Sequence, residues 1–259
     1  MNQNVKRSLF IATLSSCALS SYAQEDGGQS LSQAANDPTA LISAYQLQDF
    51  YTSQFHNNDD IDANTTQFRG AVPFTLGGVD NIARITVPYV TENAQGDSGI
   101  SDTTLFNLAV FETDWGRWGA GAVALVPTGD RDIGSGQWGA GPAIGFTAQS
   151  GKLLWGAFNQ NVFSVGERFD GQEINISNIQ PIIAYGLGNG WSLGTSEMNT
   201  VYDWDADKFV SIPIGTKLSK MVTFDTTPVQ FSASYERNLY DDTIAPRDTF
   251  GLIAKILIP

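Results

Sequence analysis

The side chains that most often perform catalysis or bind metals are scarce in this chain. It has one His and one Cys among 259 residues. A Ser–His hydrolase would have to use His56 as its general base, but His56 lies in a stretch of Asn and Asp where nothing supplies a paired Ser. One Cys excludes an internal disulfide and a Cys-ligated zinc site, and one His excludes a His-clustered metal site. We therefore expect no catalytic, cofactor-binding or metal-binding residues.

Two short motifs resemble ligand-binding loops without completing them. Asp203, Asp205 and Asp207 have the spacing that opens a calcium-binding loop, but the turn Gly and the closing Glu of such a loop are missing. The Gly-rich stretch 134–141 has no Lys, which a phosphate-binding P-loop requires. We interpret its glycines as turn and strand-packing residues.

Acidic residues outnumber basic residues. The chain has 14 Lys and Arg against 27 Asp and Glu, and its formal net charge is −13. A nucleic-acid-binding protein needs the opposite sign to neutralise phosphates, so nucleic acid is excluded as a partner. Most of the acids lie in polar stretches that we expect to be surface loops. There they either keep the surface solvated or hold divalent cations that bridge to lipopolysaccharide phosphates.

The first residues predict that the chain is exported. Residues 1–23 combine a positive start at Lys6 and Arg7, a short apolar run and a small-residue cleavage site that ends at Ala23, which are the parts of a secretory signal peptide. An alternative is a bacterial lipoprotein, because the residues up to Cys17 loosely fit a lipoprotein cleavage box. Either interpretation predicts that the mature chain is exported from the cytoplasm.

Most of the remaining chain alternates between apolar and polar side chains. In the segment 248–258, Phe250 and Leu252 fall on one face, whereas Thr249 and Lys255 fall on the other. Such alternation predicts antiparallel strands, each with one apolar face. The segments with this pattern are 42–54, 67–74, 82–90, 103–113, 118–127, 136–148, 152–163, 174–187, 190–201, 209–218, 229–236 and 248–258.

Alternating strands fit two architectures. A soluble exported sandwich buries the apolar faces, whereas a membrane barrel turns them toward lipid and keeps a polar lumen. The strands are long enough to cross a membrane at a tilt, and the 6 Trp residues lie near strand ends, as in an aromatic girdle. The polar faces carry amides, basic residues and small residues instead of a continuous charged surface. We predict an all-β, antiparallel up-and-down transmembrane β-barrel.

Loop lengths set the topology, because short and long connections alternate along the chain. Bacterial barrels have short periplasmic turns and longer outer loops. The strands from residue 67 onward would therefore begin at the outer face, so an exported chain needs one more strand before them. The segment 42–54 is the only candidate, and it gives an even count of about twelve strands.

A helix over 42–54 is the competing interpretation, because Leu47, Phe50 and Tyr51 share a helical face. We prefer the strand, since the topology requires one. The predicted domains are the signal peptide at 1–23, an N-terminal periplasmic or luminal segment at 24–41 with a short helix around 29–36, and the outer-membrane β-barrel at 42–259.

The polar positions opposite the lipid-facing stripes predict the lining of the lumen. Four of them are basic, and two interpretations are open. The basic side chains disfavour cations inside the barrel, or they pair with Glu236 and with loop aspartates and only fill space. The predicted pore-lining residues are Arg69, Arg84, Asn107, Asn159, Asn161, Gln180, Lys217, Gln230, Glu236 and Lys255.

A resemblance to a known family rests on residues 120–146, AGAVALVPTGDRDIGSGQWGAGPAIGF, which carry Pro-Thr-Gly, then Gly-Ser-Gly-x-Trp, then Gly-Pro. This region resembles a large family of bacterial outer-membrane proteins known as phenol-degradation-pathway (MetA-like) proteins, often called transporters. One departure is at 99–102, where Gly-Ile-Ser-Asp replaces the usual Gly-Leu-Gly-Asp. Further matches extend over nearly the whole mature chain, at 69–92, 104–111, 155–166, 179–191 and 211–220.

The resemblance implies an outer-membrane β-barrel and an uptake channel, with aromatic or other hydrophobic compounds as proposed substrates and no catalytic residues. We therefore expect a channel for small molecules. The competing functions are a structural or adhesive barrel whose acidic loops contact surface partners and, with least support, a lipid-modifying barrel enzyme. The expected partners are outer-membrane lipid and lipopolysaccharide, the barrel-assembly machinery and a small-molecule substrate.

Overall fold

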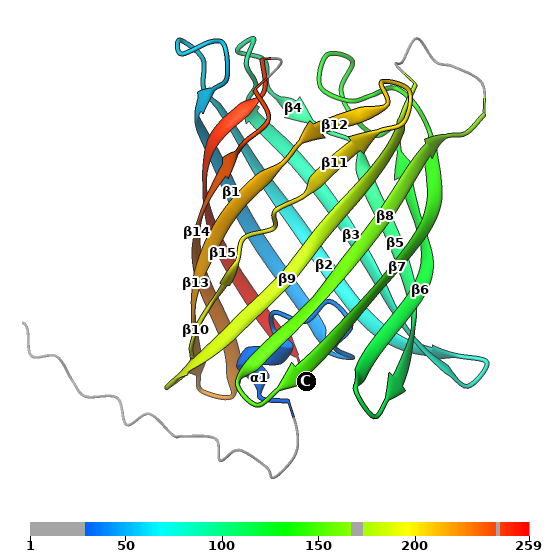
Figure 1. The fold of residues 1–259 in the computed structure, drawn as a ribbon, viewed down its shortest axis with the longest axis vertical. Helices are drawn as coiled ribbons and strands as arrows, with labels where there is room; N and C mark the ends of the chain where they lie inside the picture. The colour runs from blue at the N-terminus through cyan, green and yellow to red at the C-terminus, as the bar shows by residue number, and fades with distance from the viewer. Residues whose placement is uncertain (1–28, 167–172, 242–243, 259) are drawn as a thin grey trace, which may run out of the picture.

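The computed structural model describes residues 29–166, 173–241 and 244–258, which form an antiparallel β-barrel (Figure 1). Strand β10 pairs with β13 on one side and with β9 on the other, so the sheet closes on itself. Closure matters in a membrane because it removes the unpaired edge that an open sheet would expose to lipid. The strands are β1 (Ser43–Phe55), β2 (Ala63–Leu76), β3 (Val79–Glu92), β4 (Gly99–Ile100), β5 (Thr103–Thr113), β6 (Gly116–Val126), β7 (Gly139–Ser150), β8 (Leu153–Ser164), β9 (Asn175–Gly188), β10 (Trp191–Thr195), β11 (Thr200–Asp203), β12 (Lys208–Ser211), β13 (Pro213–Phe224), β14 (Thr227–Asn238) and β15 (Pro246–Ile258).

The predicted all-β antiparallel barrel is confirmed, and it has 12 crossing strands. Strands β10 and β11 are two pieces of one crossing, and β12 and β13 are two pieces of the next, while β4 is a short addition beside β3. The segment 42–54 forms β1, so its helical interpretation is wrong. Strand β1 pairs with both β2 and β15, and two ladders of backbone hydrogen bonds outweigh the helical periodicity of its side chains.

Two-residue turns join the strands at one end of the barrel. At the first of them Gly77 and Gly78 have φ angles of 60° and 81°, which suit the tight hairpin turns that match the twist of paired strands. The last of these turns is short because β13 continues to Phe224 and β14 begins at Thr227. We call this the short-turn end and the opposite one the long-loop end; the short turns lie at 77–78, 114–115, 151–152, 189–190 and 225–226.

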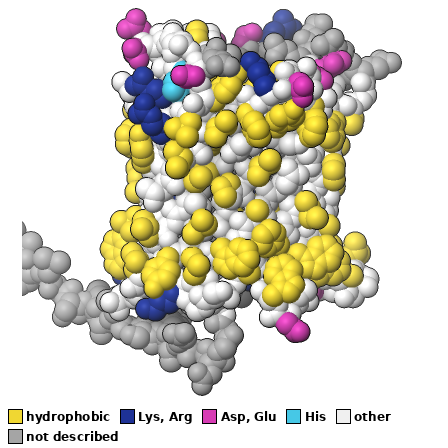
Figure 2. All heavy atoms as spheres, in the orientation of Figure 1, with side chains coloured by type: hydrophobic (Ala, Val, Ile, Leu, Met, Phe, Trp, Pro, Cys, Tyr) yellow, Lys and Arg dark blue, Asp and Glu magenta, His cyan; other side chains and the backbone are white. Residues whose placement is uncertain are grey.

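Apolar side chains cover the outside of the barrel in two belts, one near each end (Figure 2). On β15, Leu252 is 65% exposed, whereas Leu257, on the opposite face of the same strand, is 1% exposed. The Trp side chains lie near strand ends, as an aromatic girdle requires. The apolar face of the alternation therefore points outward, which excludes the soluble sandwich.

Inside the barrel, one side of the wall is also apolar. The inward side chains of β5, β6, β7, β8 and β9, together with Ile82 of β3, pack into one buried cluster, and the rings of Phe106 and Phe158 meet edge to face at 5.4 Å. We call this surface the apolar wall. Its largest members are Phe106, Leu108, Val123, Leu154, Phe158 and Ile182.

The chain enters the barrel through a short helix, as expected. Helix α1 (Leu31–Ala34) begins with a capping box, in which Ser30 and Gln33 each satisfy a backbone N–H of the other. Residues 29–42, which we call the N-terminal segment, lie inside the short-turn end (Figure 1). Leu41 packs against the apolar wall. No helix in the described part of the chain is long and apolar enough to cross a membrane.

Candidate functional site

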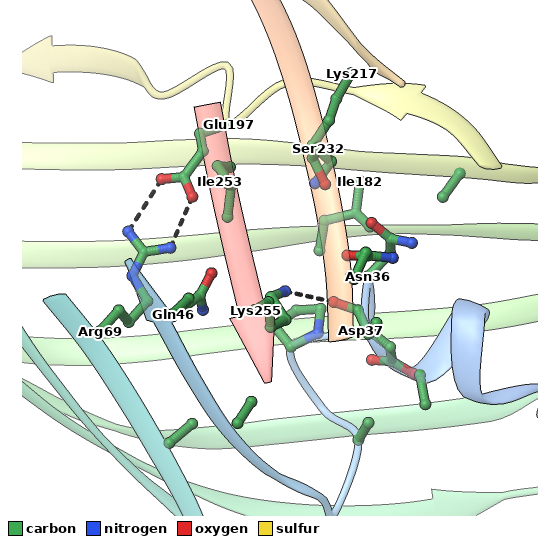
Figure 3. A pocket seen from close by; sticks show the side chains of 18 of the residues that line it. Asn36, Asp37, Gln46, Arg69, Ile182, Glu197, Lys217, Ser232, Ile253 and Lys255 are labelled. Carbon is green, nitrogen blue, oxygen red and sulfur yellow. Dashed lines mark hydrogen bonds and ion pairs between the residues drawn. The ribbon is translucent and has the colours of Figure 1, made fainter. Parts of the chain in front are cut away.

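A cavity of about 130 Å³ lies in the lumen, between the N-terminal segment and the barrel wall (Figure 3). Part of the apolar wall bounds it, through Phe106 and Ile182. The N-terminal segment, β9 and residues 195–197 contribute further lining, and the contiguous strands β13, β14, β15, β1, β2 and β3 carry charged and amide side chains into the lumen. We call this second surface the charged wall; it consists of Gln48, Arg69, Arg84, Lys217, Gln230 and Lys255.

The N-terminal segment is held beneath the cavity by polar contacts and by apolar packing of Ala35 with Ala44 and Leu257. Asp37, whose side chain is 1% exposed, forms an ion pair with Arg117 of β6. The other carboxylate oxygen of Asp37 accepts the Thr39 backbone N–H at 2.8 Å and the Thr147 hydroxyl at 3.0 Å. Lys255 Nζ donates to the Ala35 carbonyl oxygen at 2.5 Å. These contacts fix the segment to two distant parts of the barrel, β6–β7 and β15.

One crossing of the barrel is interrupted beside the cavity. Between β10 and β11 the residues 196–199 leave the ladder, and the Thr195 hydroxyl takes over hydrogen bonds to the backbone of Pro181 and Ile183 on β9. Glu236 Oε2 accepts the Ser196 hydroxyl at 2.7 Å and the Met198 N–H at 2.9 Å. Glu236 of β14 therefore holds the interrupted segment in place of the missing sheet partners.

This interruption brings Glu197 into the lumen, where it pairs with Arg69. The two Nη atoms of Arg69 donate to the two carboxylate oxygens of Glu197 at 2.7 and 3.0 Å. Gln48 Nε2 donates to the same carboxylate at 3.2 Å. The Arg69 and Glu197 side chains are only 16% and 21% exposed, so a bidentate pair in this position is well shielded from water (Figure 3).

Three further cations of the charged wall have no carboxylate partner among the residues that the structure describes. Arg84 lies 4.5 Å from the centre of the Phe106 ring and makes a long hydrogen bond of 3.4 Å to Gln160. Lys255 contacts only the backbone oxygen of the N-terminal segment, and Lys217 extends toward the cavity (Figure 3). After the Arg69–Glu197 pair is counted, the lumen keeps an excess of positive charge.

The predicted pore-lining residues fall into two groups. Glu236 faces inward on β14, above the cavity lining, and Arg69, Arg84, Gln180, Lys217, Gln230 and Lys255 line the cavity itself. The structure corrects the expected lumen positions of Asn107, Asn159 and Asn161. Asn107 shares the outward face of β5 with Leu105, and Asn159 and Asn161 share the outward face of β8 with Trp155.

The reason for this correction is that β5 and β8 depart from the usual barrel pattern, in which polar side chains point inward and apolar side chains point outward. Their inward positions carry the large apolar side chains of the apolar wall, such as Leu108 and Phe158, so the polar residues between them face outward. There they bond to one another: Asn107 donates to Asn81 at 3.1 Å, and Asn161 donates to Asn159 at 2.7 Å. Polarity alone cannot assign a face where both faces carry apolar residues.

Sequence reasoning missed two acidic residues that organise the lumen, Asp37 and Glu197. Each had a local signal. The alternation of the predicted strand 190–201 breaks at Ser196–Asn199, which marks a departure from the ladder. Asp37 precedes Pro38, a pair that favours turns over regular structure. Neither signal reveals the cation on the far side of the barrel that each carboxylate meets.

His56 lies at the long-loop end of the barrel, directly after β1. Its Nε2 atom lies 2.8 Å from the backbone carbonyl oxygen of Asn238. Among the described residues, no Ser or Thr hydroxyl forms a hydrogen bond with the His56 ring. The ring therefore links the loop after β1 to the end of β14. The predicted signal peptide, including Cys17, lies outside the described part of the chain.

Comparison with known proteins gives a likeness in structure only. No protein-family model matches the chain, and no curated protein matches it. The COG4313 outer membrane channel from Pseudomonas putida F1 superposes with a TM-score of 0.59 at 13% identity, over 84% of this chain and 95% of that chain.

Two further solved structures are more distant. Outer membrane phospholipase A from Escherichia coli superposes with a TM-score of 0.46 at 13% identity, over 88% of this chain and 97% of that chain. A mutant of the monoaromatic hydrocarbon channel TodX superposes with a TM-score of 0.39 at 10% identity, over 86% of this chain and 93% of that chain. At these scores neither bears on the activity of this chain. The likeness to the Pseudomonas putida channel shows that the chain has the fold of outer-membrane β-barrels.

Proposed function

We propose that the protein is a channel of the bacterial outer membrane through which small molecules pass by way of the barrel lumen. The observation that carries the proposal is the cavity between the two walls. A barrel that served only as a scaffold could fill its interior with packed apolar side chains, as the apolar wall does on its own side. Here Lys and Arg side chains line an open space instead. Removing such charges from water is unfavourable, and a barrel that only served as a scaffold would gain nothing from it.

The N-terminal segment closes the lumen at the short-turn end, so passage requires this segment to move. Its anchors are polar groups, namely Asp37 with Arg117, Thr39 with Thr147, and the Ala35 carbonyl with Lys255. Polar contacts can be replaced by contacts with water, so the main loss on opening is the apolar packing of Leu31, Ala35, Leu41 and Ile42. We infer that the segment opens and closes the route while the barrel stays intact.

The apolar wall supports aromatic or other hydrophobic compounds as the class that passes. Phe106, Ile82 and Ile182 reach the cavity and offer a surface on which an apolar ring can pack. This agrees with the resemblance of residues 120–146 to the MetA-like family, whose members are linked to phenol degradation. We propose that the chain is a member of that family and enters the outer membrane after removal of its signal peptide.

Uptake by intact cells tests the proposal. Initial uptake of radiolabelled phenol and benzoate is measured in cells with and without the protein, at a low external concentration so that entry limits the rate. We expect faster initial uptake of at least one compound when the protein is present, and no change for radiolabelled sucrose, which is too bulky for the cavity. Equal uptake rates for every compound, with the barrel present in the outer membrane, would overturn the proposed function.

A further inference from the structure

The cavity in the lumen holds more positive charge than its own acids can balance. Its charged lining comprises Arg69, Arg84, Lys217 and Lys255 against Asp37 and Glu197. Both acids are already engaged, since Asp37 pairs with Arg117 and Glu197 pairs with Arg69. In the described part of the chain, Arg84, Lys217 and Lys255 are left without an ion pair. The chain as a whole is strongly acidic, so this local excess runs against its composition.

A second observation indicates what kind of group is missing. Gln230 of β14 lines the same cavity as Lys217 of β13 and Lys255 of β15; it is 1% exposed, and its Nε2 atom has no hydrogen-bond partner. Lys255 is the direct cross-strand neighbour of Gln230. A buried donor without an acceptor is unfavourable unless something fills the site. Two ammonium groups and one amide donor together lack an acceptor with negative charge.

The opposite side of the cavity is apolar. Phe106, Ile82 and Ile182 line it, and the guanidinium of Arg84 covers the Phe106 ring at the boundary between the two walls. The volume of about 130 Å³ is close to the roughly 150 Å³ of an engineered apolar cavity that accepts benzene. The space therefore suits one ring or a short branched chain, with a polar end on one side only.

We propose that this cavity is a binding site for a small monocarboxylate with an apolar body about the size of a benzene ring. The carboxylate accepts hydrogen bonds from Lys217, Lys255 and Gln230, and the body packs on Phe106 and its neighbours. Because Lys255 also holds the Ala35 carbonyl, a bound carboxylate competes with the N-terminal segment for the same ammonium group. Binding thus loosens one of the contacts that close the lumen. The inference rests on the proposed channel and names the class of compound that it selects.

Three probes of matched size and a fourth without the ring separate the contribution of the charge from that of the ring. Benzoate, benzamide and benzamidinium share a shape but are anionic, neutral and cationic at neutral pH, and acetate keeps the carboxylate without the ring. Binding is measured at equilibrium to the full-length mature protein in lipid nanodiscs, by the change in ligand NMR relaxation on titration. We expect benzoate to bind at least about tenfold more tightly than each of the other three, since a buried charge-assisted hydrogen bond contributes roughly that factor.

Variants locate the site. The double variant Lys217→Gln and Lys255→Gln should weaken benzoate binding by about tenfold or more and leave benzamide binding unchanged. Lys220→Gln is the matched control, because Lys220 lies on the same strand as Lys217 but on its other face, where it contacts the ring of Trp191 and the Asn189 carbonyl. A slower-migrating boiled sample on a denaturing gel checks that each variant still forms the barrel.

The outcomes separate this inference from the proposed channel, because binding at equilibrium needs no passage of solute. Tighter binding of benzoate, lost in the double variant and kept in Lys220→Gln, supports the site even if uptake is not seen. Equal binding of benzoate, benzamide and benzamidinium, or full benzoate affinity in a folded double variant, would overturn it even if uptake is measured.

Discussion

The charged wall and the apolar wall enclose the same lumen but are built on opposite principles. Across the apolar wall, Leu108, Leu154 and Phe158 are at most 2% exposed and pack against one another as in a soluble core. Across the charged wall, Glu197 from the interrupted crossing pairs with Arg69, whereas Lys217 and Lys255 form no ion pair among the residues that the structure describes. The apolar wall stabilises the barrel, and the charged wall is available for function.

The largest expected effect is the loss of stability when one large side chain of the apolar wall is truncated. Leu108→Ala leaves a cavity at a fully buried position and should lower the free energy of unfolding by about 2–5 kcal/mol. Leu105→Ala is the matched control on the same strand, since Leu105 is 43% exposed toward lipid, and its effect should be much smaller. Urea titration of the refolded protein in micelles, followed by Trp fluorescence, measures both; equal losses would contradict the assignment of the two faces.

The next effect concerns the N-terminal segment, which bridges the two walls. Asp37→Asn removes the ion pair with Arg117 and weakens the contact with the Thr39 N–H, so docking of the segment should weaken by about 2 kcal/mol. The barrel should unfold as before, because the segment is not part of its ladder. Faster amide exchange at Thr39, without faster exchange in β8, is the expected result. Asp59→Asn, at an exposed loop carboxylate, is the control and should leave exchange unchanged.

A smaller effect is expected at the ion pair of the charged wall. Glu197→Gln leaves Arg69 with a neutral partner and should destabilise the protein by about 1–2 kcal/mol, less than for a fully buried pair because both side chains keep some contact with water. Replacing Arg69 with Gln as well should restore part of the loss. A double variant that is less stable than the sum of the two single variants would contradict the pairing.

The smallest effect is on ion preference. The excess of lumen cations should make the channel prefer anions, and Arg84→Gln should shift the reversal potential in a salt gradient toward cation preference. Lys152→Gln, at the exposed turn between β7 and β8, serves as the control. An unchanged reversal potential in folded Arg84→Gln protein would make Arg84 a packing residue on Phe106.

The sequence predicts the barrel and one wall of its lumen well. On β2, β3, β13, β14 and β15 most large outward side chains are apolar, and alternation predicts that Arg69, Lys217 and Lys255 point inward, where they line the cavity. On β5 and β8 both faces contain apolar residues, so alternation does not identify the inward face. That face becomes clear only in the closed barrel, where Phe106 contacts Phe158. Contacts across the lumen, such as Asp37 with Arg117, join residues far apart in the chain and depend on closure.

The central claim is that solutes pass through the lumen when the N-terminal segment moves, and a reversible cross-link tests it directly. The hydroxyl oxygens of Thr39 and Thr147 lie 2.7 Å apart, so cysteines at both positions should form a disulfide that locks the segment to β7. The background is Cys17→Ser, and each single cysteine variant is the control. In planar bilayers we predict little single-channel current from the oxidised double variant and a clear, repeatable current after reduction. The same current before and after reduction, or none from either form, would contradict the account.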